Sequence, residues 1–164
     1  MGVKTNVLDT GQISQGSGLW LGTLRRYLLF VLAVNLVWET LHLPLYTIWF
    51  EDTPGALAFA VVHCTGGDVL IALSSVMLAL ILVGNNAWPL IRFGPVALLT
   101  VLFGVTYTVF SEWLNIVVRK SWAYSEYMSV IPVIDAGLSP VAQWIVIPAV
   151  GLWWCWSWTK RVRS

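Results

Sequence analysis

The chain has 164 residues, of which 58% are hydrophobic and 10% are charged, and its formal net charge is +1. Soluble domains carry about 25% charged residues, so this tryptophan-rich composition excludes a water-soluble domain and indicates an integral membrane protein. No basic patch interleaves with a groove-like motif, so no nucleic-acid partner is expected. The two cysteines, Cys64 and Cys155, form neither a disulfide framework nor a CxxC zinc pattern.

Residues 1–26 are expected to form a polar N-terminal tail followed by an interfacial segment. Residues 1–18 contain Asp9 and lack the apolar core of a secretory signal peptide. Arg25 and Arg26 then stand at the mouth of the first long apolar run. The membrane domain is therefore predicted to begin at Tyr27.

Four apolar runs follow in the chain, at 27–50, 56–83, 94–118 and 139–158. Each reaches the roughly 20 residues that a helix needs to cross about 30 Å of hydrocarbon. Backbone groups in lipid must be satisfied internally, which favours helices, and the runs lack the alternation of a β-barrel. The sequence thus predicts an all-α, integral membrane, four-helix transmembrane bundle over residues 27–158, with a basic C-terminal tail at 159–164.

The basic residues predict the orientation of this bundle. With four spans, the termini and the loop between spans two and three share one side, which holds Lys4, Arg25, Arg26, Arg92, Lys160, Arg161 and Arg163. The opposite side holds only Arg119 and Lys120. The positive-inside rule therefore places both termini in the cytoplasm. The expected location of the protein is a bacterial inner membrane.

The first span carries ionisable residues near its centre. Asn35, Glu39 and His42 are spaced i, i+4 and i+7, so they form one stripe on the helix. At a rise of about 1.5 Å per residue, Glu39 lies roughly 16 Å and His42 roughly 12 Å below the outer face. A polar stripe at this depth suggests a buried site rather than a lipid-facing surface.

The later spans also place polar groups in the outer half of the membrane. On span two, His63 lies about 10 Å deep and Asp68 about 18 Å deep, although they are about 140° apart around the helix. On span three, Tyr107 lies about 16 Å deep and Glu112 about 9 Å deep. The inner half is almost purely apolar, so the polar residues are sorted by depth.

Three intramembrane carboxyl groups without Lys or Arg at their depth cannot all be bare anions. They must be protonated, share protons, face water or bind a cation. Functional sites commonly contain such groups, so the candidate catalytic residues are Glu39, Glu112, Asp68 and His42. The polar residues Thr65, Thr108, Asn115 and Gln143 are expected to serve as hydrogen-bonding contacts between helices.

Aromatic and polar residues near these four are candidates for binding a substrate. Those in the spans are Asn35, Trp38, His63, Tyr107 and Trp113. The outer loop 119–138 adds Trp122 and Tyr124, because loops of this length often cover a binding site. The alternative for this loop is an interfacial segment lying on the lipid headgroups.

The segment "NLVWE", Asn35 to Glu39, resembles the Asn-x-x-Trp-Glu element of membrane-embedded terpene cyclases. The Asn35-x-x-x-Glu39 spacing, Glu112 and "QWIVIP", Gln143 to Pro148, are similar to the EXPERA group, which includes sterol isomerases. These resemblances imply a small helical bundle in which buried acids protonate and deprotonate a sterol or isoprenoid. They imply Glu39 and Glu112 as the candidate acids.

Three functional classes remain open from the sequence. The first is an enzyme without a cofactor that isomerises or cyclises a hydrophobic, isoprenoid- or sterol-like small molecule by acid–base chemistry. The second is an iron, copper or haem protein, with ligands drawn from Glu39, His42, His63 and Glu112. The third is a non-catalytic accessory subunit or transporter. Membrane lipids are expected partners in each case, and the chain could act as a homodimer or in a larger membrane complex.

Overall fold

The computed structural model describes residues 9–163. In chain order the elements are α1 (Asp9–His42), the 3-10 turn η1 (Leu43–Leu45), α2 (Ile48–Glu51), α3 (Pro54–Val83), α4 (Phe93–Trp113), the π-helical turn η2 (Leu114–Val118), β1 (Val130–Ile131), β2 (Ala136–Gly137) and α5 (Leu138–Arg163). Four segments are long and apolar enough to cross a membrane: Gly18–Leu45, Pro54–Val83, Phe93–Val118 and Leu138–Val162. The prediction of an all-α membrane four-helix bundle is confirmed.

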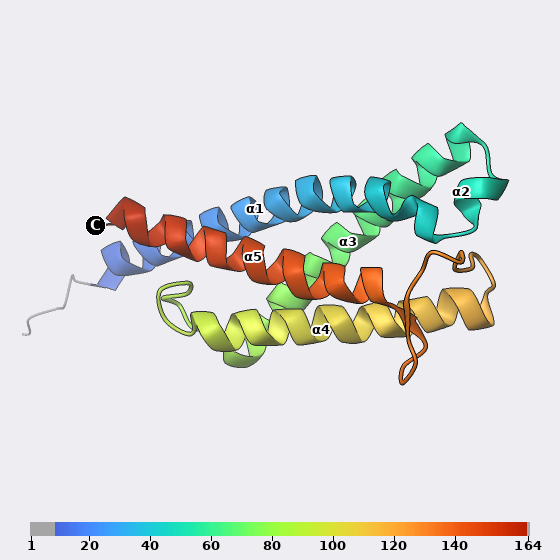
Figure 1. Ribbon diagram of the computed structural model, residues 1–164. Coiled ribbons are helices and arrows are strands. Elements are labelled where there is room, and N and C mark those ends of the chain that lie inside the picture. The colour runs from blue at the N-terminus through green and yellow to red at the C-terminus, as the bar shows by residue number, and fades with distance from the viewer. Residues whose placement is uncertain (1–8, 164) are drawn as a thin grey trace, which may run out of the picture.

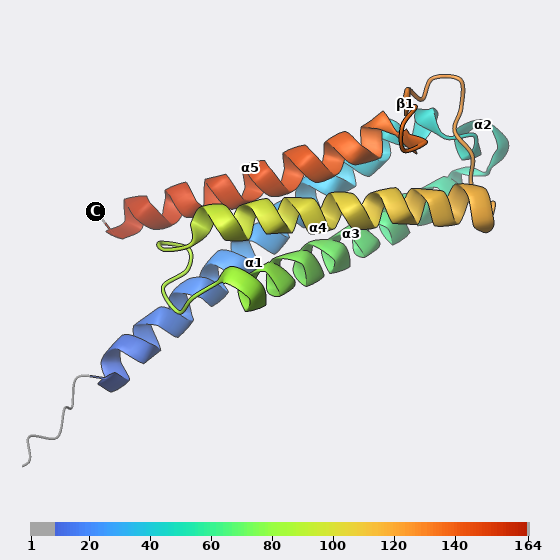
Figure 2. The same cartoon turned by 90° about the horizontal axis from the view of Figure 1, so that it is seen from below.

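The four long helices run along one another, with each packed on two neighbours in the cyclic order α1, α3, α4, α5 (Figure 1). The C-terminus and the turn between α3 and α4 lie at one end of the bundle, and α2 and the loop before α5 lie at the other. The first turns of α1 extend away from the other helices (Figure 2). We call the end with α2 the outer end and the opposite end the inner end.

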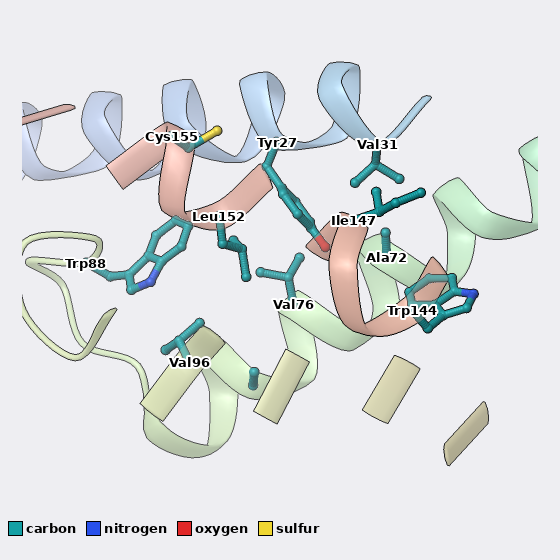
Figure 3. Close-up of a cluster of buried hydrophobic side chains, with 11 residues drawn as sticks. Tyr27, Val31, Ala72, Val76, Trp88, Val96, Trp144, Ile147, Leu152 and Cys155 are labelled. Atoms are coloured by element: carbon teal, nitrogen blue, oxygen red, sulfur yellow. The ribbon is translucent and has the colours of Figure 1, made fainter. Parts of the chain in front are cut away.

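Each long helix buries one face through residues about four positions apart, because residues at i and i+4 lie one above the other on a helix. On α4 this buried row is Val96, Thr100, Gly104, Thr108 and Glu112. The apolar core runs from Trp88 near the inner end to Trp144 further out (Figure 3). Glu39, Asp68 and Glu112 each lie on the outer side of core residues of their own helix, Val31, Ala72 and Val96, so the core lies between these carboxyl groups and the inner end.

Two glycines allow α5 to approach its neighbours closely. A Cβ at Gly104 of α4 would collide with the indole ring of Trp144. A Cβ at Gly151 would lie 2.7 Å from the ring of Phe30 on α1. The bare backbone of Gly104 therefore sets the position of Trp144 in the core.

The boundaries of three helices, α1, α3 and α5, differ from the predicted ones. Helix α1 already begins at Asp9, inside the expected tail, and ends at His42 rather than at Phe50, because Pro44 lacks an amide hydrogen and stands in the turn η1. Helix α3 begins at Pro54, where Thr53 caps it by accepting a bond from the Ala56 amide at 3.3 Å. Helix α5 continues through the expected C-terminal tail to Arg163. The part of the expected N-terminal tail at 1–8 lies outside the described residues.

The loop between η2 and α5 is fastened to the connection between α1 and α3. Tyr124 forms an antiparallel bridge with Tyr46, and the Thr47 amide donates to the Ala123 carbonyl at 2.9 Å. Ser125 donates its amide to the Leu45 carbonyl and its hydroxyl to the Pro44 carbonyl, at 2.9 and 2.8 Å. A short hairpin of β1 and β2 completes the loop. These bonds hold it across the outer end of the bundle.

Candidate functional site

The polar stripe of α1 lies inside the bundle. Asn35, Glu39 and His42 occur on successive turns of one helix face, and all three side chains are buried. Because that face is directed at α3 and α5, the polar groups must find their partners on those helices. Glu39 and His42 each have two side-chain hydrogen-bond partners, and Asn35 has one.

The side-chain amide of Gln143 on α5 is the centre of this arrangement. Its nitrogen lies 2.8 Å from the Asn35 Oδ1, 2.8 Å from the Glu39 Oε1 and 3.0 Å from the Asp68 Oδ2. An amide nitrogen carries two hydrogens, so three oxygens compete for two donors. This one side chain joins α1, α3 and α5.

Glu39 and Asp68 therefore bring two buried carboxyl groups to the same amide nitrogen, at 2.8 and 3.0 Å. Two buried carboxylates that share one donor repel each other when both are ionised. The Trp144 side chain, next to Gln143 in the sequence, is held in place by its close contact with Gly104. The basic side chains of α1 and α5 lie near the inner end, where Arg26 and Lys160 cover tryptophan rings.

His42 connects Glu39 to the start of α5. Its Nε2 lies 3.1 Å from the Glu39 Oε2, and its Nδ1 lies 3.1 Å from the Ser139 Oγ. The Trp38 indole donates to the same Ser139 oxygen at 3.3 Å. If Ser139 donates to Nδ1, then Nε2 carries the proton and donates to Glu39; a doubly protonated ring would donate to both partners. Either arrangement supplies Glu39 with a donor.

Glu112 on α4 is held by two tyrosines from the outer end. The hydroxyl of Tyr124 donates to its Oε2 at 2.6 Å, and the hydroxyl of Tyr46 donates to the same atom at 3.3 Å. The Gly137 amide donates to the Tyr124 oxygen at 2.7 Å. Burial, and then the bond to Glu112, raise the pKa of Tyr124, so its hydroxyl stays protonated and remains a donor.

The two groups of carboxyls belong to one polar cluster. The rings of His42 and Tyr46 meet edge to face, with centroids 5.4 Å apart. The thiol of Cys64 lies within electrostatic reach of Glu39, Asp68 and Glu112 together. Thr65 and Thr108, one turn from Asp68 and Glu112, have buried hydroxyls without a hydrogen-bond partner in residues 9–163. We call the set Asn35, Glu39, His42, Asp68, Glu112 and Gln143 the acid cluster.

Several predicted substrate-binding residues lie away from the acid cluster. His63 is exposed and stacks on Phe59 of its own helix, with centroids 5.5 Å apart. Helix α3 continues without a break through Gly66 and Gly67, so the angular separation between His63 and Asp68 persists. Tyr107 and Trp113 are about half exposed, at 49% and 50%, because each is one residue away from the buried row of α4. The bundle therefore directs these three side chains outward.

The other predicted binding residues are nearer to the site. Trp38 contacts Ser139, and Tyr124 reaches Glu112 from the loop. Trp122 is partly buried, and its indole nitrogen has no partner within the described part of the chain. The same described part holds no group of three or more His, Cys, Asp or Glu arranged to bind a metal ion. Because His63 is directed outward, the four residues considered as metal ligands do not form one shell.

Sequence analysis did not predict Tyr46, Ser139 or Trp144 as part of the site. Tyr46 lies just beyond η1, and only the fold turns its hydroxyl back toward Glu112. Ser139 and Trp144 occur near the outer start of α5, and their proximity to Gln143 in the sequence is the one signal that could have indicated them. Gln143, expected as a contact between helices, has that role for three helices at once.

Comparisons of the chain with models of known protein families, with curated proteins and with solved structures find no match. The resemblances to terpene cyclases and to the EXPERA group therefore rest on their short motifs alone. The functional argument depends on the geometry of the acid cluster.

Proposed function

We propose that this integral membrane protein is an enzyme that isomerises or cyclises a lipid-soluble, isoprenoid- or sterol-like substrate by proton transfer. The observation that supports the proposal best is that the buried carboxyl groups of Glu39 and Asp68 meet at one amide nitrogen of Gln143, at 2.8 and 3.0 Å. Two carboxylates so close together in an apolar bundle disfavour ionisation of both, so in this proposal one of them holds a proton. A carboxylic acid kept neutral in such surroundings is suited to protonate an alkene or epoxide.

The proposed reaction is balanced without a cofactor. The acid of the Glu39–Asp68 pair gives its proton to one carbon of a double bond, whose π electrons form the new C–H bond and leave a cation on the neighbouring carbon. A second double bond of the substrate can attack this cation and close a ring. A carboxylate or neutral His42 then takes a proton from an adjacent carbon, and the C–H electrons form a double bond at a new position.

The surrounding residues have separate roles in this proposal. Gln143 is a positioning residue, because its amide holds both carboxyl groups of the pair. The rings of Tyr46 and Tyr124 meet at a centroid distance of 5.7 Å beside Glu112 and offer π faces to a cationic intermediate. Glu112, bonded by both tyrosines, is the second candidate acid.

Deuterium exchange tests the proposal without knowledge of the substrate. The purified protein in lipid bilayers is incubated in heavy water with a mixture of isoprenoid and sterol lipids, and mass spectrometry detects deuterium incorporated at carbon. We expect incorporation with the parent protein and its loss in Glu39→Gln, since glutamine keeps the shape but cannot supply the proton. Glu126→Gln, which changes an exposed loop carboxyl, is the matched control and should keep incorporation. Equal incorporation by Glu39→Gln and the parent would contradict the proposal.

We also propose that both termini face the cytoplasm of a bacterial inner membrane. The support is the asymmetry of basic residues, since Arg25, Arg26, Arg92, Lys160 and Arg161 all belong to the inner end of the bundle. A cysteine introduced at Glu126 should be labelled by an impermeant reagent from outside intact cells, and one at Asn86 should not. The opposite labelling pattern would reverse the orientation.

A further inference from the structure

Helices α1 and α5 meet in a seam that carries a basic side chain near the inner end of the bundle. The two helices pack along each other (Figure 1), and the hydroxyl oxygens of Thr23 and Thr159, 3.5 Å apart, mark their register there. This register brings Arg26 of α1 beside the last turns of α5. The Cζ of Arg26 lies 3.4 Å from the centre of the Trp158 ring.

An aromatic pair lies one helical turn further toward the outer end in the same seam. The rings of Phe30 and Trp154, each four residues from Arg26 or Trp158, stack with centroids 5.8 Å apart. Gly151 lets the helices approach here, because a Cβ on it would lie 2.7 Å from the Phe30 ring. Trp154 and Trp158 are 43% and 37% exposed, so the seam opens on the outside of the bundle. We call Arg26, Phe30, Trp154 and Trp158 the inner seam.

The positive charge of the inner seam has no acidic partner. Segments 10–38 and 136–164 contain no Asp or Glu, but they contain Arg25, Arg26, Lys160, Arg161 and Arg163. Among the residues that the structure describes, no carboxylate forms an ion pair with Arg26. Arg26 also lies within Gly18–Leu45, a segment apolar enough to cross a membrane. Charged side chains in such segments normally pair with another group, so this guanidinium is suited to an anion from outside the chain.

We propose that the inner seam binds one anionic phospholipid, with the lipid phosphate on Arg26 and an acyl chain along Phe30 and Trp154. A guanidinium can donate two parallel hydrogen bonds to a phosphate, and its planar shape suits that geometry. Trp158 contacts the guanidinium and holds it in place by cation–π attraction. The other basic residues at this end favour a lipid with net negative charge over a zwitterionic one.

The order of the groups in the inner seam is the order of the groups in a phospholipid. The cation lies nearer the inner end, and the stacked rings lie one turn, about 5.4 Å, closer to the middle of the bundle. The phosphate of a lipid likewise lies outside the hydrocarbon layer that its chains form. The exposed rings would add nothing to the binding of free phosphate. This site is separate from the acid cluster and does not depend on the proposed reaction.

Lys160 provides a matched comparison at the same end of the bundle. Its Nζ lies 3.8 Å from the centre of the Trp156 ring, and that ring stacks on Phe93 of α4 with centroids 4.8 Å apart. Two residues on a helix are about 160° apart around its axis, so Lys160 and Trp158 lie on nearly opposite sides of α5. Lys160 thus has the same charge and a similar ring contact, but it lies outside the inner seam.

Native mass spectrometry of the purified full-length protein tests this site. The protein in detergent is titrated with phosphatidylglycerol or with phosphatidylcholine of the same chain length, and the bound lipid is counted. We expect one tightly bound phosphatidylglycerol, and binding of phosphatidylcholine that is about tenfold weaker or more. Arg26→Gln should weaken phosphatidylglycerol binding by a similar factor, because it removes the charged donors. Lys160→Gln removes the same charge and should keep the binding.

A second measurement uses only the parent protein and so does not depend on a variant folding. A phosphatidylglycerol probe with a diazirine on its acyl chain is irradiated in bilayers, and the labelled peptides are identified. We expect labels on α1 and α5 near Phe30 and Trp154. Labels confined to α3 and α4 would overturn the proposal. Equal binding of the two lipids, or equal losses in Arg26→Gln and Lys160→Gln, would also overturn it, because the lipid would then respond only to the overall charge of the inner end or to none.

Discussion

Replacing Gln143 by leucine removes the amide that joins α1, α3 and α5 while keeping a side chain of similar size. Two amide hydrogens serve Asn35, Glu39 and Asp68, at 2.8, 2.8 and 3.0 Å. Gln143→Leu therefore removes two hydrogen bonds and leaves buried oxygens without these donors. The change should loosen the outer half of the bundle and leave the apolar core around Leu152 intact.

The expected magnitude follows from these two bonds. Hydrogen bonds between membrane helices contribute about 0.6 kcal/mol on average and about 1.7 kcal/mol at most, because the unfolded state in a membrane also finds partners. Two such bonds give a loss of about 1–3 kcal/mol in the free energy of unfolding. The burial of Glu39 and Asp68 favours the upper part of this range, since both carboxyls lose their common donor.

The assay is reversible unfolding in mixed micelles by increasing the fraction of denaturing detergent, followed by circular dichroism. Val146→Ala is the control, because it changes a half-exposed residue on α5 outside the acid cluster. Gln143→Leu should unfold at a clearly lower detergent fraction than the parent and the control. If Gln143→Leu were as stable as the parent protein, the argument that this amide holds the acid cluster together would be refuted.

Two other predictions concern packing and pH. Gly104→Ala should destabilise the protein by about 1–3 kcal/mol, because its Cβ collides with Trp144, whereas Gly67→Ala faces open space and should not; the same detergent titration compares them. Burial and the bond to Glu112 raise the pKa of Tyr124 above the ordinary value of about 10. The folded state therefore keeps a proton that the unfolded chain loses as the pH rises above about 10. The free energy of unfolding of the parent protein should decrease above this pH, and that of Tyr124→Phe should decrease less. The difference in ultraviolet absorbance between the parent and Tyr124→Phe, followed against pH, should show that Tyr124 loses its proton at a higher pH than a free tyrosine does. Loss of the proton at a lower pH would contradict this prediction.

The helical class and the number of spans could be predicted because they follow from local chain properties. Four apolar runs of sufficient length, in a solvent that forbids unsatisfied backbone groups, leave few structures open. The ends of these helices were predicted less well. Pro44 ends α1 eight residues before the end of the first apolar run, because a proline effect on the backbone outweighs the hydropathy of the residues that follow.

The candidate acids could be selected from the sequence because charge burial is costly at any position in a span. Glu39, Asp68 and Glu112 were chosen by their depth and by the lack of basic neighbours, and all three are buried. His63, at a similar depth, faces outward. Depth depends only on position along a helix, whereas facing also depends on which side of that helix its neighbours occupy.

The sequence by itself determined that this chain crosses a membrane as four helices with acidic groups toward one end of the bundle, because length, hydropathy and charge are properties of each segment alone. The tertiary structure alone decided that Gln143 binds both Glu39 and Asp68, that Tyr46 and Tyr124 hold Glu112, and that Trp144 rests on Gly104. These partners are separated by up to 104 residues in the chain. Their contacts depend on the order and rotation of packed helices, which no single segment encodes.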